Sequence, residues 1–327
     1  MLILQGLTYV QPNRDLLFSA LNLHINKNDK IALIGHNGSG KSTLLKILSG
    51  NLNPSMGVLK ADVKPYYVPQ VYGQYNDYTV ADALDVADKL NAFYAILDGQ
   101  ATESNLEILN DDWTIEERCK EALALWDLDQ LDLTQKLELL SGGQKTKVFL
   151  AGIHVHKPEM VLLDEPSNHL DGASRLMLYR YLASAKYTLL VVSHDRTLLN
   201  LLDTVYELNK GAITVYGGNY DFYVEQKKIE MQALEHDLKS KGKALRKAKE
   251  TEKESVERQQ KLDARGKKKQ EKAGLPTISM NTLKNNAEKS TSKIKGVHAE
   301  KVNEISKDLS ELRKEVVDVE KMKMGFE

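Results

Sequence analysis

The chain has 327 residues, of which 28% are charged and 42% are hydrophobic, an ordinary balance for a globular protein. This length suits one large core with an appendage, or two domains. The N-terminal segment MLILQGLTYVQPNRD has no basic residues ahead of its apolar ones, which argues against a signal peptide, and no apolar run approaches the roughly 18 residues of a membrane helix. A single cysteine, Cys119, excludes an internal disulfide. We therefore expect a cytoplasmic chain without a membrane segment of its own.

Charge is distributed unevenly along the chain. Residues 239–295 contain 18 Lys and Arg against 7 Asp and Glu, a net of +11, whereas the whole chain sums to −1 and the remainder therefore to −12. An acidic body with a basic projection predicts that the projection meets an anionic partner. The plainer alternative is a solvated, charged helix.

The first informative element is a short apolar strand, KIALIG at 30–35, followed by the helical pattern KSTLLKILSG. Between them, GHNGSGKST at 35–43 fits the phosphate-binding pattern G-x-x-x-x-G-K-[ST]. Its glycines let the backbone wrap an anion at a helix N-terminus. Lys41 is placed to reach the β- and γ-phosphates of a nucleotide, and the Ser42 hydroxyl to ligate Mg²⁺. A mere glycine-rich turn would not need Lys and Ser at these positions.

A helical region follows, from about residue 75 to 150, with helical periodicity in VADALDVADKLNAFYAIL and EERCKEALALWDL. It predicts a helical subdomain inserted in an α/β core, with Gln70 of VPQ at the junction. Near its end, LSGGQ opens a further helix with Ser141, Gly142 and Gly143. This is a second anion-binding helix N-terminus, for which a protein with one nucleotide has no internal use.

Two later apolar runs, EMVLLDEP at 159–166 and YTLLVVSH at 187–194, predict buried strands of a mainly parallel sheet. The first ends in Asp164, placed to hold Mg²⁺, and Glu165, placed to orient or deprotonate an attacking water. The second places His194 at the end of what we expect to be the last core strand. A DE pair alone could begin a helix, and a histidine at a strand end is often only a satisfied polar group.

The phosphate loop, Gln70, LSGGQ, the DE pair and His194, in this order, resemble the ATP-binding cassette ATPases over about the first 220 residues. The resemblance implies a P-loop cassette fold and cassettes that pack head to tail in pairs, so that each ATP lies between one phosphate loop and the partner's LSGGQ helix. SNHLD at 167–171 matches the loop that communicates across this interface.

The resemblance also implies roles for individual residues. Glu165 and His194 are the expected catalytic residues, His194 as a contact of the γ-phosphate. Adenine is expected near Gln11 or Pro12, with Tyr9 as the nearest aromatic, although Tyr9 could equally be a core residue. The expected ATP-binding residues are Gly35, Asn37, Gly38, Ser39, Gly40, Lys41, Ser42, Thr43, Gln70 and Tyr9, with Ser141, Gly142, Gly143 and Gln144 serving the opposite site, and the expected Mg²⁺ ligands are Ser42, Gln70 and Asp164.

Four kinds of cassette protein are distinguishable. A coiled-coil chromosome or repair ATPase splits its cassette, which this chain does not, and a non-enzymatic regulator would be expected to lose Lys41 or Glu165. A transporter subunit would need membrane partners and usually lacks a long helical tail. The fourth kind is the ABC-F group of soluble tandem cassettes acting on ribosomes, which LDEPSNHLD and YGGNYDFYVEQK at 216–227 resemble.

The remainder, 223–327, predicts an antiparallel helical hairpin. Its first helix, from about 221 to 272, is polar and free of proline, and would be about 75 Å long. From Gly296 a second helix carries apolar residues at spacings of 3 and 4, typical of a coiled-coil seam. Lys241 and Gly242 interrupt the first helix's seam, so we expect the pairing to fray there. The second helix's seam residues are Val302, Ile305, Leu309, Leu312, Val316 and Val319.

The tip of this hairpin, about 258–295, holds 11 basic and 3 acidic residues. In ABC-F proteins the resembling linker touches tRNA and ribosomal RNA near the peptidyl-transfer region, so we expect salt-dependent phosphate contacts here. A spacer without an RNA role is the alternative. The candidate nucleic-acid contacts are Arg258, Lys261, Arg265, Lys267, Lys268, Lys269, Lys272 and Lys284.

The chain holds one cassette where the ABC-F group has two. We therefore expect either the N-terminal half of a longer protein or a natural half that homodimerises. In both cases a lone cassette should turn over ATP weakly or not at all, because LSGGQ must come from a partner. Translational control, rescue of stalled complexes and displacement of an antibiotic all remain open as roles.

Overall fold

A computed structural model describes residues 1–70, 73–209, 211–273, 292, 296–297, 299–313 and 316, and for residues 263, 267 and 269–273 it describes the backbone alone. The chain divides into two compact units, Met1–Val224 and a second unit that begins at Glu225.

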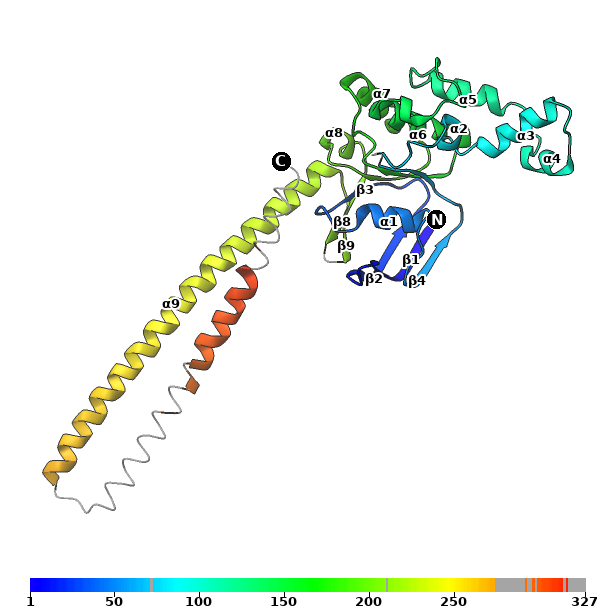
Figure 1. The fold of residues 1–327 in the computed structure, drawn as a ribbon. Coiled ribbons are helices and arrows are strands. Elements are labelled where there is room, and N and C mark those ends of the chain that lie inside the picture. The colour runs from blue at the N-terminus through cyan, green and yellow to red at the C-terminus, as the bar shows by residue number, and fades with distance from the viewer. Residues whose placement is uncertain are drawn as a thin grey trace. The chain divides into compact units, whose positions relative to one another are not determined.

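The first unit is built on a six-stranded sheet with the order β5-β6-β7-β3-β8-β9 (Figure 1). The first five strands in this order pair in parallel, and β9 pairs antiparallel with β8. The mainly parallel sheet predicted from the sequence is confirmed, and its central strands are buried along their whole length because both faces are covered. The strands are β3 Lys30–Ile34, β5 Tyr66–Val68, β6 Met160–Asp164, β7 Thr188–Val192, β8 Thr204–Asn209 and β9 Ala212–Tyr216.

A second, antiparallel sheet of order β2-β1-β4 joins β1 Leu2–Val10, β2 Leu16–Ile25 and β4 Met56–Ala61. The helix α1, Lys41–Leu48, is common to the core of both sheets: its Leu44 and Leu45 are fully buried in one apolar cluster with residues of β1, β2, β3, β6 and β7. Burying this surface holds the start of α1, and therefore the phosphate loop, against the ends of the parallel strands.

The helical subdomain lies between β5 and β6 in the chain, as predicted, and forms one side of the cassette (Figure 1). The long helical pattern over 80–97 is divided in two, because Asp85 adopts a left-handed backbone (φ 57°) between α2 and α3. The helix α4 was not predicted. The helices here are α2 Val80–Ala83, α3 Ala87–Leu97, α4 Glu103–Leu109, α5 Ile115–Ala124, the 3-10 helix η1 Leu137–Leu139 and α6 Gly142–His156.

The expectation that His194 follows the last core strand is wrong. After β7 come the short helix α8, Arg196–Leu199, and then β8 and β9; the helix α7, Gly172–Ala183, lies between β6 and β7. The segment TVYELN gave a weak strand signal because it carries Glu207 in its middle. That carboxylate is 2% exposed and accepts hydrogen bonds from the hydroxyls of Tyr216 (3.0 Å) and Tyr223 (3.4 Å), which make its burial tolerable.

The second unit contains most of α9, a helix of 54 residues from Tyr220 to Ala273 that is about 80 Å long. A second helical stretch, described over 299–313, lies beside α9 (Figure 1). Lys241 of α9 pairs with Asp308 at 2.7 Å, and a Cβ at Gly242 would lie 3.9 Å from Leu309, which is 5% exposed. The expected fraying at Lys241 and Gly242 is therefore wrong: Lys241 forms an ion pair with Asp308 across the seam, and Leu309 lies beside Gly242.

The contact between α6 and β5 generates a prediction on packing. A Cβ at Gly152 in α6 would lie 1.8 Å from the Tyr66 hydroxyl of β5, which donates to the Phe149 carbonyl at 3.2 Å. Alanine usually stabilises a helix interior by about 1 kcal/mol over glycine, but here we expect Gly152→Ala to lower the free energy of unfolding by about 1–3 kcal/mol in denaturant titrations.

Gly172→Ala is the matched control, because nothing lies within 4 Å of a Cβ at this helical glycine. It should leave the free energy of unfolding unchanged or slightly raised. A Gly152→Ala protein as stable as the Gly172→Ala control would contradict the close contact.

Candidate functional site

A cavity of about 470 Å³ opens where the parallel strands end. Three chain segments form its floor: the loop after β3, the end of β6 and the end of β7. Parallel strands bring their carboxyl ends to one edge, which is why residues more than 150 positions apart meet here. The cavity is lined by Gln11, Leu17, Asn37, Gly38, Gly40, Lys41, Ser42, Thr43, Gln70, Asp164, Glu165, Asn168, Val192 and His194.

The phosphate loop is shaped by glycine at two places. Gly40 precedes α1 with a left-handed backbone (φ 97°), and a Cβ there would lie 2.6 Å from the ring of Phe18. Gly35 packs so closely that a Cβ would lie 2.4 Å from the Leu208 carbonyl oxygen. The backbone of this loop therefore has no alternative to glycine at either position, and its amide groups are presented at the start of α1.

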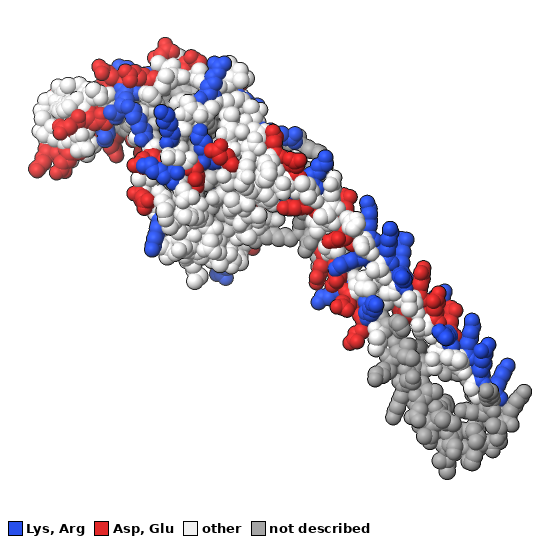
Figure 2. Space-filling model, turned by 180° about the vertical axis from the view of Figure 1, so that it is seen from behind, with Lys and Arg blue, Asp and Glu red and all other residues white. Residues whose placement is uncertain are grey.

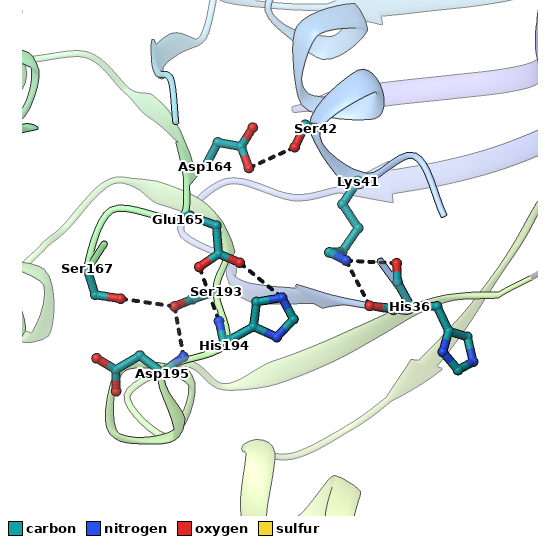
Figure 3. A network of polar contacts seen from close by, with 10 residues as sticks. His36, Lys41, Ser42, Asp164, Glu165, Ser167, Ser193, His194 and Asp195 are labelled. Carbon is teal, nitrogen blue, oxygen red and sulfur yellow. Dashed lines mark hydrogen bonds and ion pairs between the residues drawn. The ribbon is translucent and has the colours of Figure 1, made fainter. Parts of the chain in front are cut away.

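Lys41 points back over the loop (Figure 3), where its Nζ donates to the carbonyl oxygens of Gly35 (2.8 Å) and His36 (3.0 Å). Burial lowers the pKa of this ammonium, and the nearby carboxylates of Glu165 and Asp164 act against that decrease. The group is thus a partly desolvated cation, held at the place where a nucleotide phosphate would offer it anionic oxygens.

Asp164 lies at the end of β6 and is 1% exposed. Its Oδ1 accepts a hydrogen bond from the Ser42 hydroxyl (3.1 Å), and its Oδ2 accepts one from the Tyr67 hydroxyl (3.2 Å). Burial raises the pKa of Asp164, while both hydrogen bonds act to lower it. Burial also raises the pKa of Tyr67 far above the neutral range, so this hydroxyl remains a donor. A carboxylate, a hydroxyl and the Gln70 amide at one cavity are oxygen donors of the kind Mg²⁺ prefers, and the residues therefore fit this ion.

Glu165 follows with a left-handed backbone (φ 51°), held by a hydrogen bond from its own N–H to the Val192 carbonyl (2.8 Å). The carboxylate accepts from the backbone N–H of His194 (3.3 Å), and its Oε1 lies 3.4 Å from the His194 Nε2 (Figure 3). Burial raises the pKa of Glu165 to about 7, and burial followed by the Lys41 charge lowers the pKa of His194. Near neutral pH the imidazole is therefore uncharged, and the pair is a hydrogen-bonded contact with one titrating carboxyl group.

Two buried hydroxyl groups connect the loops that follow Glu165 and carry His194. The Ser167 Oγ lies 3.4 Å from the Ser193 Oγ, which accepts from the backbone N–H of Asp195 at 3.0 Å (Figure 3). Asp195 in turn caps α8 by accepting from the amides of Thr197 and Leu198. The two serines are 4% and 2% exposed. These contacts fix the loop after Glu165 to the loop that carries His194.

The LSGGQ segment forms the N-terminus of α6 through a reciprocal cap. The Ser141 Oγ accepts from the Gln144 N–H (3.3 Å), and the Gln144 Oε1 accepts from the Ser141 N–H (2.9 Å). A Cβ at Gly143 would lie 2.8 Å from the backbone oxygen of His169, so this helix end rests directly on the SNHLD loop. None of these residues lines the cavity described above.

The structure brings most of the predicted site residues together but not all of them. Gly35 and Ser39 belong to the phosphate loop without lining the cavity, and Tyr9 packs against the hydrophobic core, whereas Gln11 and Leu17 line the cavity. Of the predicted nucleic-acid contacts, Lys284 lies outside the described residues, as do the side chains of Lys267, Lys269 and Lys272; those described are exposed on α9, namely Arg258, Lys261, Arg265 and Lys268.

Sequence reasoning missed Leu17 and Tyr67, and it placed Asn168 in the SNHLD loop without assigning it to the cavity. Tyr67 had a usable signal, because it stands three residues before Gln70 in a strand whose alternation sends Tyr66 and Tyr67 to opposite faces. Leu17 had no such signal in the sequence, because it reaches the cavity only through the packing of β2 beneath the phosphate loop.

Residues 18–168 match the profile of the ABC transporter family. This part of the chain is an ATP-binding cassette. The cassette belongs to a family with ATPase activity. No helix in the described part of the chain is both long enough and apolar enough to cross a lipid bilayer.

Two curated relatives illustrate the similarity. The energy-dependent translational throttle protein EttA of Haemophilus influenzae is 32% identical over 73% of this chain and 46% of its own length. The ABC transporter F family member 2 of Arabidopsis thaliana is 34% identical over 67% of this chain and 30% of its own length. The chain thus spans about half the length, or less, of the curated relatives it matches.

Among solved structures, the ATP-binding cassette MJ0796, a dimer in a post-hydrolysis state bound to ADP and Pi, superposes with a TM-score of 0.52. It is 22% identical and aligns with 66% of this chain and 98% of its own length. A likeness at this identity shows the shared cassette fold.

The buried Glu165 generates a prediction on stability. Its pKa is about 7 in the fold against an ordinary 4.5, so the protonated form stabilises the fold fully below pH 4.5, and this contribution is lost as the pH rises through 7. We expect Glu165→Gln to raise the free energy of unfolding, and the gain to grow by about 2 kcal/mol, or roughly 4–8 °C in Tm, between pH 5 and pH 8.

Glu159→Gln serves as the control in the same thermal unfolding series. Glu159 is exposed and paired with Lys27 at 2.9 Å, which lowers the pKa of its carboxyl group. It should show no gain that grows with pH. An equal gain for Glu165→Gln at pH 5 and at pH 8 would contradict the raised pKa.

Proposed function

We propose that this protein hydrolyses ATP at a composite site formed by two cassettes packed head to tail. The observation that carries the proposal is the separation of two anion-binding elements within one cassette. The phosphate loop, Asp164, Glu165 and His194 line one cavity, while the Ser141–Gln144 helix end lies outside its lining. Head-to-tail pairing would place the partner's Ser141, Gly142, Gly143 and Gln144 over the nucleotide in this cavity.

In this mechanism the chain's own residues have separate roles. The phosphate loop and Lys41 hold the β- and γ-phosphates, with the loop amides at the start of α1. Mg²⁺, held by Ser42 and Gln70 with Asp164 beside them, would neutralise phosphate charge when bound. Glu165, with a pKa of about 7, is matched to accept a proton from an attacking water near neutral pH. His194 holds the Glu165 carboxylate through its ring and its backbone N–H while its ring faces the γ-phosphate position.

We further propose that the protein is an ABC-F member and acts on the ribosome. The support comes from the relatives: one is named a translational throttle protein and another an F family member. Tandem cassettes in such proteins would supply the second cassette that this chain needs, either from a C-terminal half or from a second copy. A cytoplasmic location follows from this assignment.

The long helix supplies a surface that suits this role. Lys and Arg side chains stand out along α9, interspersed with Asp and Glu (Figure 2). Arg258, Lys261, Arg265 and Lys268 are exposed, and with Lys267, Lys269, Lys272 and Lys284 they would contact rRNA or tRNA phosphates near the peptidyl-transfer region. ATP-driven closure of the cassettes would then favour the ribosome-bound form, and hydrolysis its release, so that the protein modulates translation or protects it from an antibiotic.

A mixing experiment tests the composite site. Lys41→Ala removes the phosphate contact and Ser141→Arg blocks the partner's helix end, so each variant alone should lose nearly all ATPase activity. A dimer of one Lys41→Ala chain and one Ser141→Arg chain keeps one of its two sites intact. Mixing equal amounts of the two variants makes half of the dimers mixed, and should therefore restore about a quarter of the wild-type rate. Phosphate release is the readout, measured across protein concentration.

Two outcomes would contradict the composite site. One is an Ser141→Arg protein that retains wild-type turnover. The other is a wild-type rate per molecule that does not change with protein concentration while the protein remains monomeric in sedimentation.

Ribosome co-sedimentation tests the proposed partner. We expect the Glu165→Gln variant to pellet with ribosomes in ATP and not in ADP, and to lose this binding as salt rises, by about tenfold per doubling of salt if several phosphates are contacted. Deletion of residues 266–293 should abolish it, whereas Lys27→Gln with Lys120→Gln, which removes positive charge from the cassette instead, should leave pelleting unchanged.

Absence of pelleting under every nucleotide would contradict the ribosomal role. Co-purification with a membrane fraction in the same experiment would instead support a transporter subunit. Pelleting that survives the deletion would leave the ribosome as partner and overturn the role of the basic tip.

A further inference from the structure

Asp164 is held from both sides by hydroxyl groups, and only one of them belongs to the nucleotide-binding loop. Ser42 donates to Oδ1 at 3.1 Å, and Tyr67 donates to Oδ2 at 3.2 Å. Because Asp164 is 1% exposed, water has little access to replace a lost donor. Each carboxylate oxygen therefore depends on its own protein partner.

Tyr67 is fixed in place independently of the cavity. It lies on β5, pairs with Leu162 of the neighbouring strand β6 and packs its ring against the hydrophobic core. Its neighbour Tyr66 points to the opposite face and donates to Phe149 in α6. The hydroxyl of Tyr67 is thus delivered to Asp164 by a rigid strand rather than by a loop.

The hydrogen bond from Tyr67 to Oδ2 fixes the orientation of the Asp164 carboxylate. An aspartate with a free Oδ2 can rotate about its Cβ–Cγ bond, a torsion with broad minima, and turn Oδ1 away from Ser42. With Oδ2 held by Tyr67, Oδ1 stays on the Ser42 hydroxyl. That hydroxyl then directs its proton to Asp164 and leaves its lone pairs for a cation beside the phosphates.

We propose that Tyr67 is a positioning residue for the metal-bound nucleotide, acting through Asp164. The same strand end also leads to Gln70 at the cavity, so β5 presents both the residue that orients Asp164 and a further oxygen donor. This inference rests on the proposed binding of ATP with Mg²⁺. It adds a residue that does not touch nucleotide or metal but fixes the orientation of Asp164 and, through Asp164, that of the Ser42 hydroxyl.

The test compares Tyr67→Phe with Tyr66→Phe, adjacent substitutions that each remove one buried hydroxyl. The readout is the affinity for a fluorescent ATP analogue in Mg²⁺ and in EDTA, from which the Mg²⁺-dependent gain in affinity is calculated. We expect Tyr67→Phe to reduce this gain by about tenfold while the affinity in EDTA changes by less than about twofold. Tyr66→Phe should keep the wild-type gain.

Two further measurements keep the result interpretable. Thermal unfolding of both variants checks that each is folded at the assay temperature, which we expect because both substitutions keep the aromatic ring. Combining Tyr67→Phe with Asp164→Asn should reduce the Mg²⁺-dependent gain no more than Asp164→Asn alone, because Tyr67 acts through Asp164.

A wild-type gain in Tyr67→Phe, an equal loss in Tyr66→Phe, or additive losses in the double variant would each overturn the inference and leave the proposed function standing. If the wild-type protein bound the analogue equally in Mg²⁺ and in EDTA, the proposed use of Mg²⁺ would fail first and the inference with it.

Discussion

The parallel alignment of β3, β6 and β7 is the constraint on which the rest of the cassette depends. Hydrogen bonding in register brings Leu33, Val192 and Asp164 side by side, and the chain leaves all three strands at the same edge. The phosphate loop, the two acids and His194 therefore share one cavity although each comes from a different part of the sequence. Antiparallel pairing of any one of these strands would carry its functional residue to the far edge.

Burial at this edge has a chemical consequence. Asp164 and Glu165 are adjacent carboxyl groups with 1% and 8% exposure, and the environment treats them differently. Burial raises the pKa of both groups, but at Asp164 two hydroxyl donors act against the increase, whereas the pKa of Glu165 reaches about 7. Two neighbouring acids thus acquire separate tasks, one as an oriented anion and one as a group that can exchange a proton.

The sequence sufficed for those parts of the fold and site where local residues dictate local structure. Gly35, Gly40 and Lys41 stand at spacings that only a phosphate loop requires, and the apolar runs before Asp164 and His194 suffice for buried strands. Three features were not predictable in this way. β8 was missed because Glu207 is a charged residue in the middle of the strand, and its burial is acceptable only beside two tyrosine hydroxyls. Leu17 reaches the cavity through the packing of another sheet. The Lys241–Asp308 pair joins positions 67 residues apart.

The contact between the two helices of the second unit at Lys241 and Gly242 defines how much of α9 extends beyond it. Leu309 lies beside Gly242 and Lys241 is bound to Asp308, and α9 continues beyond this contact for the 31 residues from Lys243 to Ala273, or about 46 Å. The number of residues in α9 beyond Gly242 therefore sets how far the helix reaches from this contact. Removing seven residues from α9 beyond Gly242 would keep every seam residue on the same face of the helix and shorten this reach by about 10 Å. Removing one residue would rotate every residue beyond it by about 100° around the helix axis. Changes in whole heptads should thus tune reach, and single insertions should redirect it.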